Sequence, residues 1–379
     1  MTAPEGQAAQ SRAVGTMRPP TRIPRARAAA SVTPMGYAPM RSRSERVALR
    51  VHIRTVAACA VLAAGLLGMA VLALTVGDFP LSPSEVAAVL VGQGSPGHEF
   101  IVFTLRMPRL LTALFVGAAL AVSGAILQRL SGNPLGSPDI IGFTNGAATG
   151  ALIVIVLISG SMLQIALGAL VGGVVTAVII YLLAFTRGVR GSRFILVGIG
   201  IAAMALAANS YLITRASLQD ALSAQAWLVG SINNVGTEQA VAVGLALAVL
   251  LPVAVYHGRA LSLLGMGDDA AKALGVGVER SRLVLILVSV VLAAIATAAT
   301  GPILFVALAA PQLAQRLTRS PGPGLIPAAL MGALLLLVSD FAVQRLFSTA
   351  ALPVGTATGL IGGLYLIWLL IAEWRRGRG

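Results

Sequence analysis

The sequence predicts an all-α, polytopic membrane protein with about ten transmembrane helices. Of its 379 residues, 57% are hydrophobic and only 11% are charged, whereas an ordinary soluble domain has about 25% charged residues. The apolar residues form runs of about 20, the length at which a helix crosses a bilayer. Because lipid offers the backbone no hydrogen-bond partners, these runs must be helical, or irregular only where protein or water covers them.

A basic segment precedes the first apolar run. Residues 1–54 are rich in Arg, Ala, Pro and Ser, contain only two acidic residues and show no lasting apolar period. This composition predicts a disordered cytoplasmic tail, followed by a membrane domain over 55–379. A transit peptide, a lipid-binding tail, or a true start at Met35 or Met40 are the alternatives. We expect no signal peptide, because a cleavable one would lie at the extreme N-terminus.

The apolar runs after the tail predict the membrane spans in order. The predicted spans are 55–76, 107–129, 142–159, 162–186, 194–214, 239–256, 282–300, 302–317, 325–344 and 353–372. The stretch between the second and third spans, SGNPLGSPDIIGFTNG (131–146), contains two prolines and four glycines. Such a stretch predicts a broken helix that lines a cavity at membrane depth. Small residues at 116–124 and 168–173 predict close helix packing.

The loop cations predict the orientation. With the N-terminus inside, most loop arginines lie on the cytoplasmic side, and four lie outside: Arg106, Arg109, Arg215 and Arg345. This positive-inside asymmetry places both termini in the cytoplasm and supports an even number of spans. Because the net charge of +14 is spread over loops on one side, it does not indicate nucleic-acid binding.

The chain carries no energy source of its own. The predicted spans contain almost no ionisable side chains, which ion-coupled transporters place inside the membrane. A phosphate-binding loop of the form GxxxxGK[ST] is excluded, because the single lysine, Lys272, is followed by Ala273. The three histidines have no metal-ligand spacing. Active transport by this protein would therefore need a partner that supplies the energy.

Four stretches together resemble a known family. They are RMPRLLTALFVGAALAVSGAILQRLSGNPLGSPDIIGFTNGAA (106–148), GDDAAKALGVGVERSR (267–282), GPILFVALAAPQLAQRLTR (301–319) and LPVGTATGLIGGLYLIWLLI (352–371). In this order and at this spacing they resemble the FecCD-type ABC importer permeases, which have a BtuC-like fold. The resemblance implies uptake of iron–siderophores, haem or vitamin B12. The motifs are most similar to those of ferric enterobactin permease subunits.

The stretch 267–282 lies between the sixth and seventh predicted spans. Its acids would begin a short helix, where they favour the positive end of the helix dipole. A solvated connector is the alternative, but the resemblance implies coupling helices that sit in a groove of the ATPase. The apolar surface offered to the ATPase would come from Ala271, Leu274 and Val276. The predicted coupling residues are Asp268, Asp269, Lys272, Leu274, Gly275, Val276 and Gly277.

The resemblance implies three further sites. Arg106 and Arg109 would form salt bridges with glutamates of a substrate-binding protein, with snorkelling to outer head groups as the alternative. Gly191 and Ser192 would belong to the cytoplasmic gate, although the family often has a threonine at 191. The residues expected to line the translocation path are Thr144, Asn145 and Asn209.

Some positions depart from the family pattern. They are Gln312, Gln315, Gln344, Ala351 and the Pro-Gly-Pro stretch 321–323. In the family these positions commonly hold histidine, arginine, arginine, glutamate and a charged triplet. Such departures suit one half of a pair of different subunits, so the sequence favours a heterodimer over a homodimer.

We therefore predict a permease subunit of the bacterial inner membrane that translocates a ferric siderophore, with the catecholate type favoured. Its partners would be a second permease subunit, two ATPase subunits and a siderophore-binding lipoprotein or periplasmic protein. The chain is expected to catalyse no reaction and to bind no cofactor or metal, while ATP and Mg²⁺ act in the ATPase. The alternatives are a cobalamin or haem importer, an ion-coupled secondary transporter and a membrane scaffold without transport.

Overall fold

The computed structural model describes residues 37–41, 48–184, 191–233, 235–320, 322–346 and 352–376. The chain divides into two compact units, Met1–His52 and Ile53–Gly379. In the first unit, strands β1 (Tyr37–Arg41) and β2 (Ala48–His52) form an antiparallel hairpin. This hairpin lies where the sequence predicts no regular structure. The rest of the predicted tail before it lies outside the described residues, so the tail as a whole stays a prediction.

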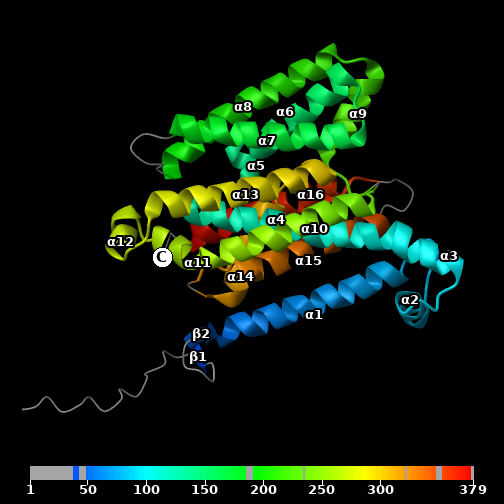
Figure 1. Cartoon of the computed structure of the whole chain (residues 1–379), viewed down its shortest axis with the longest axis horizontal. Coiled ribbons are helices and arrows are strands. Elements are labelled where there is room, and N and C mark those ends of the chain that lie inside the picture. Colours follow the sequence, from blue (N-terminus) through cyan, green and yellow to red (C-terminus); the bar gives the residue numbers. More distant parts are fainter. Residues whose placement is uncertain are drawn as a thin grey trace, which may run out of the picture. The chain divides into compact units, whose positions relative to one another are not determined.

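The regular elements described in the second unit are helices (Figure 1). In chain order they are α1 (Ile53–Thr75), α2 (Pro83–Leu90), α3 (Pro96–Glu99), the π-helix η1 (Phe100–Arg106), α4 (Met107–Ser131), α5 (Pro138–Ile141), α6 (Phe143–Ile153), the π-helix η2 (Val154–Ile158), α7 (Met162–Ala184), α8 (Gly191–Arg215), α9 (Leu218–Val229), α10 (Thr237–Tyr256), α11 (Gly258–Leu264), α12 (Asp268–Ala273), α13 (Val278–Thr300), α14 (Val306–Thr318), α15 (Leu325–Leu346) and α16 (Val354–Arg376).

Seven helices among the described residues are long and apolar enough to cross a membrane. They are α1, the continuous segment from α3 through α4, α7, α8, α10, α13 and α15. Shorter apolar helices cover Phe143–Ile158 and Val354–Trp368. The predicted span 302–317 overlaps α14, which has only 13 residues because it starts after Phe305, whose φ is 66°. The predicted all-α membrane fold is confirmed, but the count of ten spans is not.

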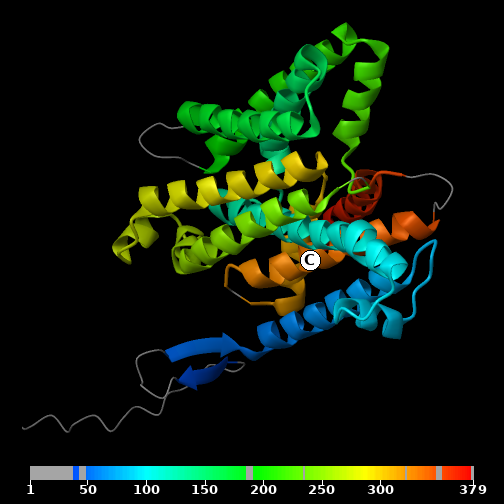
Figure 2. The same ribbon diagram turned by 45° about the vertical axis from the view of Figure 1, so that its right-hand side comes forward.

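Helix α4 lies in the middle of the second unit and contacts α10, α13, α14 and α15 (Figures 1 and 2). Every residue of α4 from Val116 to Leu127 is buried. Most of these side chains are small, so neighbouring helices approach closely, as the sequence predicts. At Gly117 and Gly332, where α4 meets α15, an added Cβ on either glycine would collide with the backbone of the other helix.

Replacing Gly117 by leucine is therefore expected to destabilise the protein by about 3 kcal/mol, the upper part of the usual overpacking range. The obstacle is the backbone of Gly332, which cannot rotate away as a side chain can. The thermal unfolding midpoint of the purified protein in detergent measures the effect. Gly68→Leu on α1 is the matched control, because a Cβ there meets nothing within 4 Å. Equal midpoints for the two variants would contradict the prediction.

Helices α6, α7 and α8 form a second layer that contacts α13. Gly150 on α6 faces Gly168 on α7, and Gly172 on α7 faces Gly146 on α6. This contact explains the small-residue stretch that the sequence places at 168–173. The layer puts α6 and α8 side by side, and this position brings the predicted path residues together.

The predicted break at 131–146 is present in the structure. Helix α4 ends at Gly132 with φ of 63°, and Gly142, with φ of 99°, turns the chain from α5 into α6. Glycine adopts these left-handed conformations without the steric cost that a Cβ brings. Ser137 caps α5, since its Oγ accepts a hydrogen bond from the Ile140 amide at 3.3 Å. The loop is thereby held by its own capping groups.

A capping box starts helix α2 in the connection between α1 and α4. Glu85 Oε2 accepts a hydrogen bond from the Ser82 amide at 2.7 Å, and Ser82 Oγ accepts one from the Glu85 amide at 3.3 Å. The Ser82 backbone and hydroxyl groups hold the pKa of the Glu85 carboxyl below its ordinary value of 4.5. Capping boxes of this kind satisfy two otherwise unpaired donors at a helix start.

The start of α2 is expected to lose order in acid. Because the folded pKa of Glu85 is depressed, its contribution is fully present above about pH 4.5 and is lost as the pH falls through the lowered pKa. Hydrogen exchange of the first amides of α2, measured against pH, tests this. The Glu85→Gln variant keeps a capping acceptor without titrating, so its protection should not change over the same range. A parallel fall in that variant would assign the effect to another group.

Candidate functional site

The predicted coupling stretch begins with α12 and the turn after it, which lie with α11 at one end of the second unit (Figure 1). We call α11, α12 and this turn the lobe. Gly267 begins α12 with φ of 103°, and Gly275 follows it with φ of 81°. Asp269, Lys272 and Gly275 are exposed. The predicted short helix with acids in its first turn is therefore present.

One predicted feature of this lobe is wrong. Ala271 is fully buried and does not contribute to an exposed apolar surface. The side chains that a partner could reach are Leu274, which is 58% exposed, and Met266, which is 67% exposed. The physical reason is packing, because Ala271 belongs to the hydrophobic core cluster that also contains Leu261, Leu264 and Val278.

Asp268 connects the lobe to the membrane helices. Its carboxylate accepts two hydrogen bonds from the guanidinium of Arg282 on α13, one from Nη2 and one from Nη1 at 3.2 Å. The Arg282 side chain is only 8% exposed, and Glu279 lies 4.0 Å from it. A bidentate pair of this kind fixes orientation as well as distance. A displacement of α12 would therefore be transmitted directly to α13.

The two arginines predicted for docking both make contacts within the chain. Arg106 donates hydrogen bonds to the backbone carbonyls of Leu74 and Phe79, at the end of α1 and just after it. Arg109 donates from Nε to Asp340 Oδ2 at 2.9 Å and from Nη2 to Asp340 Oδ1 at 2.7 Å. Each guanidinium has five N–H groups, so each arginine has more donors than the two hydrogen bonds that it makes here.

The sequence did not predict the ion pair between Arg109 and Asp340. Asp340 is buried on α15, and Gln344 Nε2 also donates to it at 2.8 Å. Its partner is 231 positions away in the chain. The only signal in the sequence was one acid and one arginine near the ends of two apolar runs, and nothing there shows that the runs are neighbours. Arg345, one residue further, is exposed and lies over the Phe341 ring at 5.8 Å.

The three predicted path residues lie together between α6 and α8. Asn209 Nδ2 lies 3.5 Å from the Asn145 carbonyl oxygen, and the Thr144 hydroxyl donates to Asp139 Oδ1 at 2.8 Å. Asn209 and Thr144 are buried. Asp139 Oδ2 and Asn209 Oδ1 are buried and meet no well-aligned hydrogen-bond donor among the described residues, although the Phe305 backbone lies near the Asp139 carboxylate. The group is thus polar and closed off in this conformation, and Asp139 is a member that the sequence analysis did not include.

The predicted gate residues lie at an edge of the described structure. Gly191 and Ser192 begin α8, and the stretch before them lies outside the described residues. Their side-chain environment is likewise outside the described part, so their gate role stays a prediction. Among the described residues, no group of three His, Cys, Asp or Glu side chains could hold a metal ion.

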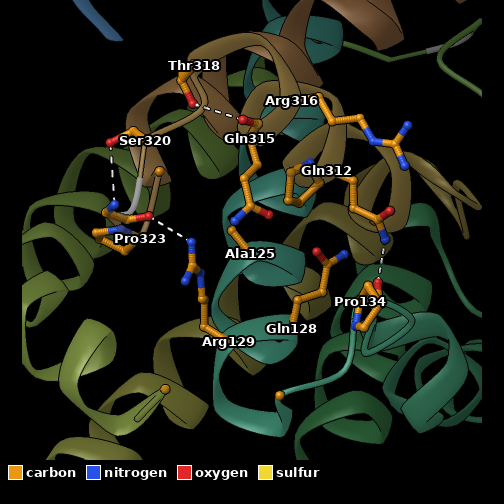
Figure 3. Close-up of a pocket in the computed structure, with 15 residues that line it drawn as sticks. Ala125, Gln128, Arg129, Pro134, Gln312, Gln315, Arg316, Thr318, Ser320 and Pro323 are labelled. Atoms are coloured by element: carbon orange, nitrogen blue, oxygen red, sulfur yellow. Dashed lines mark hydrogen bonds between the residues drawn. The ribbon is translucent and has the colours of Figure 1, made fainter. Parts of the chain in front are cut away.

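A polar pocket lies between α4, α14 and the 318–324 connection (Figure 3). We call it the α4–α14 pocket; its volume is about 390 Å³, and it also borders Gly265 beside the coupling lobe. Three positions that depart from the family pattern gather here: Gln312, Gln315 and the 321–323 stretch, through Gly322 and Pro323. Its other polar lining groups include Gln128, Arg129, Arg316 and Ser320.

Comparison with known proteins decides the family. Residues 61–372 match the FecCD transport family. The chain belongs to this family. The predicted resemblance is therefore confirmed, and this FecCD protein is a multi-pass protein of the inner membrane and a transport component.

The matches to individual relatives cover almost the whole length of those proteins. This FecCD chain is 45% identical over 326 residues to the ferric enterobactin transport system permease protein FepG of Escherichia coli (strain K12), covering 86% of this chain and 99% of that protein. It is 34% identical to the iron(3+)-hydroxamate import system permease protein FhuG of Bacillus subtilis (strain 168), with 79% and 92% covered. A solved inward-facing metal-chelate type ABC transporter matches with a TM-score of 0.74 and 30% identity, covering 83% of this chain and 98% of that one.

Proposed function

We propose that this FecCD protein is a permease subunit of an ABC importer that carries a ferric siderophore, with the catecholate type favoured, across the inner membrane. The observation that carries the proposal is the 45% identity to a ferric enterobactin permease over 99% of its length. The relatives compared above are named for iron–siderophore transport. They do not favour a cobalamin or haem cargo, or an ion-coupled mechanism.

The importer would contain a second, different permease subunit, two ATPase subunits and a siderophore-binding protein. We place both termini of the chain in the cytoplasm, on the basis of the positive-inside asymmetry. The lobe of α11 and α12 would then face the ATPase, and the outer ends of α4 and α15 would face the binding protein. ATP and Mg²⁺ would act in the ATPase, and this chain would bind no cofactor and catalyse no reaction.

The geometry supports a mechanical role for the lobe. The ATPase would contact Leu274 and Met266, which are exposed, and the Asp268–Arg282 pair would carry the displacement of α12 into α13. Helix α13 contacts α4, α7 and α10, so it reaches both layers of the helix bundle. Movement of these layers would open the polar group around Thr144, Asn145 and Asn209 to the cargo.

The outer arginines support docking of an acidic protein surface. Arg106 is partly exposed and Arg345 is exposed; Arg106 lies within electrostatic range both of Arg345, which repels it, and of Asp78, which attracts it. Arg109 would contribute through Nη1, which makes no hydrogen bond among the described residues, while Asp340 holds the other side of the guanidinium. Carboxylates of the binding protein would relieve this repulsion and form charge-assisted hydrogen bonds.

Radioactive-iron uptake in cells that lack this gene tests the proposal. Catecholate, hydroxamate and mixed ferric siderophores are supplied separately, with and without depletion of ATP. We expect loss of ATP-dependent uptake of the catecholate class, restored by the gene. Normal uptake of every siderophore in cells with no second import system would overturn the cargo assignment. Uptake that survives ATP depletion and stops when the proton gradient collapses would overturn the ABC mechanism.

A further inference from the structure

The start of α14 depends on support from other parts of the chain. Phe305, its N-cap residue, has φ of 66°, which is uncommon for a residue with a side chain. A phenylalanine side chain cannot cap a helix, although the first amides of a helix lack partners inside it. The neighbours crowd this stretch: an added Cβ on Gly362 of α16 would collide with the Phe305 side chain, and one on Gly230 with the Pro302 carbonyl. Packing therefore holds the stretch 301–305 in a strained conformation.

Asp139 reaches this helix start from the other layer of helices. Its own helix, α5, packs tightly on α8, since an added Cβ on Gly198 of α8 would collide with the Ile141 carbonyl. The Asp139 carboxylate nevertheless lies near the Phe305 backbone, where α14 begins. Helix α14 contacts α4 and α15. The contact between Asp139 and Phe305 therefore joins the α6–α8 layer to the helices around α4.

Dipoles stabilise the carboxylate of Asp139 within the described part of the chain. The Thr144 hydroxyl donates to Oδ1 at 2.8 Å, and Oδ2 is buried. No Lys or Arg among the described residues forms an ion pair with it. A carboxylate beside a helix N-terminus is favoured by the positive end of the helix dipole. The start of α14 and the Thr144 hydroxyl are therefore the electrostatic partners of Asp139.

A structural cap alone does not account for a charged group at this position. Asparagine caps helices about as well as aspartate, and it could accept the Thr144 hydroxyl without the cost of burying a charge. The location of Asp139 supplies another reason for the charge. Thr144 precedes Asn145, whose carbonyl oxygen lies 3.5 Å from Asn209 Nδ2 of α8. Asp139 is thus attached directly to the residues expected to line the path.

Helix α13 connects the lobe to the same contact. Asp268 of the lobe binds Arg282 in the first turns of α13. At its other end α13 stops at Thr300, and the stretch 301–305 follows directly. A displacement of α13 by the lobe would therefore move the start of α14 relative to α5.

We propose that Asp139 is a positioning residue of the transport cycle: its carboxylate holds α5 and Thr144 against the start of α14 while the path is closed, and it separates from α14 when the path opens. Asp139 acts through Thr144 and α14, and in this role it does not touch the cargo. The transport part of this proposal rests on the proposed function, whereas the contact between Asp139 and α14 does not.

The first test measures hydrogen exchange at the first amides of α14 and α6 in the full chain, purified in detergent. Asp139→Asn keeps the size of the side chain and an acceptor for Thr144 but removes the charge. Thr144→Val removes the donor, and Thr144→Ser retains a hydroxyl. Asp220→Asn is the matched control, because Asp220 is an acid in the first turn of α9 that likewise accepts from a hydroxyl, that of Ser217, at 2.7 Å.

We expect Asp139→Asn to raise exchange at the start of α14 about fivefold, the effect of one charge at a helix end. Exchange at the start of α6 should rise in Asp139→Asn and in Thr144→Val, while Thr144→Ser and Asp220→Asn leave both helix starts as in the wild type. Unchanged exchange at α14 in Asp139→Asn would overturn the proposal. An equal rise in every helix would also overturn it, because it marks a general loss of stability.

The second test measures siderophore uptake and ATP hydrolysis by the importer that contains each variant. If α14 is no longer held, hydrolysis continues without productive opening of the path. Asp139→Asn should therefore lower the ratio of siderophore imported to ATP hydrolysed about fivefold, and Thr144→Ser should not. Faster exchange at α14 with an unchanged ratio would make Asp139 a structural cap only and would overturn its role in transport. If the wild-type importer carries no ferric siderophore, the proposed function fails, and the exchange data still decide whether Asp139 holds α14.

Discussion

Replacing Arg109 by alanine is expected to destabilise the protein by about 3 kcal/mol, the lower end of the cost of breaking a buried ion pair. The variant leaves the carboxylate of Asp340, whose side chain is only 4% exposed, without its guanidinium. Gln344 still donates one hydrogen bond to Asp340, and the Arg109 side chain is 24% exposed. Both facts keep the loss at the lower end. The thermal unfolding midpoint of the detergent-purified protein measures it.

The double variant Arg109→Gln with Asp340→Asn should recover much of this stability, because it removes both charges together. Arg215→Ala is the matched control, since Arg215 is an exposed arginine at the end of α8. If Arg109→Ala and Arg215→Ala lower the midpoint equally, the pair contributes nothing specific. Binding-protein association, measured on the same variants, separates folding from docking: a docking role predicts weaker association even in the stable double variant.

Replacing Asp268 by alanine is expected to reduce siderophore uptake about tenfold or more while the protein stays in the membrane, because tight coupling depends on positioned contacts. The substitution breaks the connection between α12 and Arg282 of α13. Gly275→Val should act in the same direction, since a side chain at φ of 81° is strained by about 1–2 kcal/mol and shifts the turn. Uptake and the amount of protein in the membrane are measured in the same cells.

Glu238→Ala is the control for lost charge, because Glu238 is exposed and lies in the first turn of α10, outside the lobe. ATPase subunits that co-purify with each variant show whether the contact or the transmission is lost. We expect the Asp268→Ala variant to co-purify with the ATPase but to show little siderophore uptake. The Gly275→Val variant should show a partial loss both of co-purified ATPase and of uptake. Normal uptake in both variants would show that the lobe does not couple ATP hydrolysis to transport.

Local sequence signals predicted the interruptions of the helices. The glycines and prolines of 131–146 predicted the break, and the structure needs left-handed glycines at Gly132 and Gly142 to make it. The acids at the start of 267–282 likewise predicted α12. These features depend on a few neighbouring residues, so a single chain contains all the information they need. Helix α9 was not predicted, because its 12 residues are too few for a span.

Contacts between distant segments were outside the reach of the sequence. The polar group of Thr144, Asn145 and Asn209 was expected from the family. The hydrogen bond from Thr144 to Asp139, which adds a carboxylate to the group, became visible only in the structure. The same holds for Ala271, which the sequence assigned to the surface and the fold buries. An apolar alanine is equally compatible with either position, so only packing could decide.

The sequence by itself determined the membrane class of this protein and its FecCD family. The membrane class follows from the hydropathy of the chain, and the family follows from the order of the motifs along it. The tertiary structure alone decided which polar groups meet: Arg109 with Asp340, Asp268 with Arg282, and Arg129 with the α4–α14 pocket. The physical reason is that a buried charge must find its partner in space, and helix packing, through small residues such as Gly117 and Gly332, chooses which helices are neighbours.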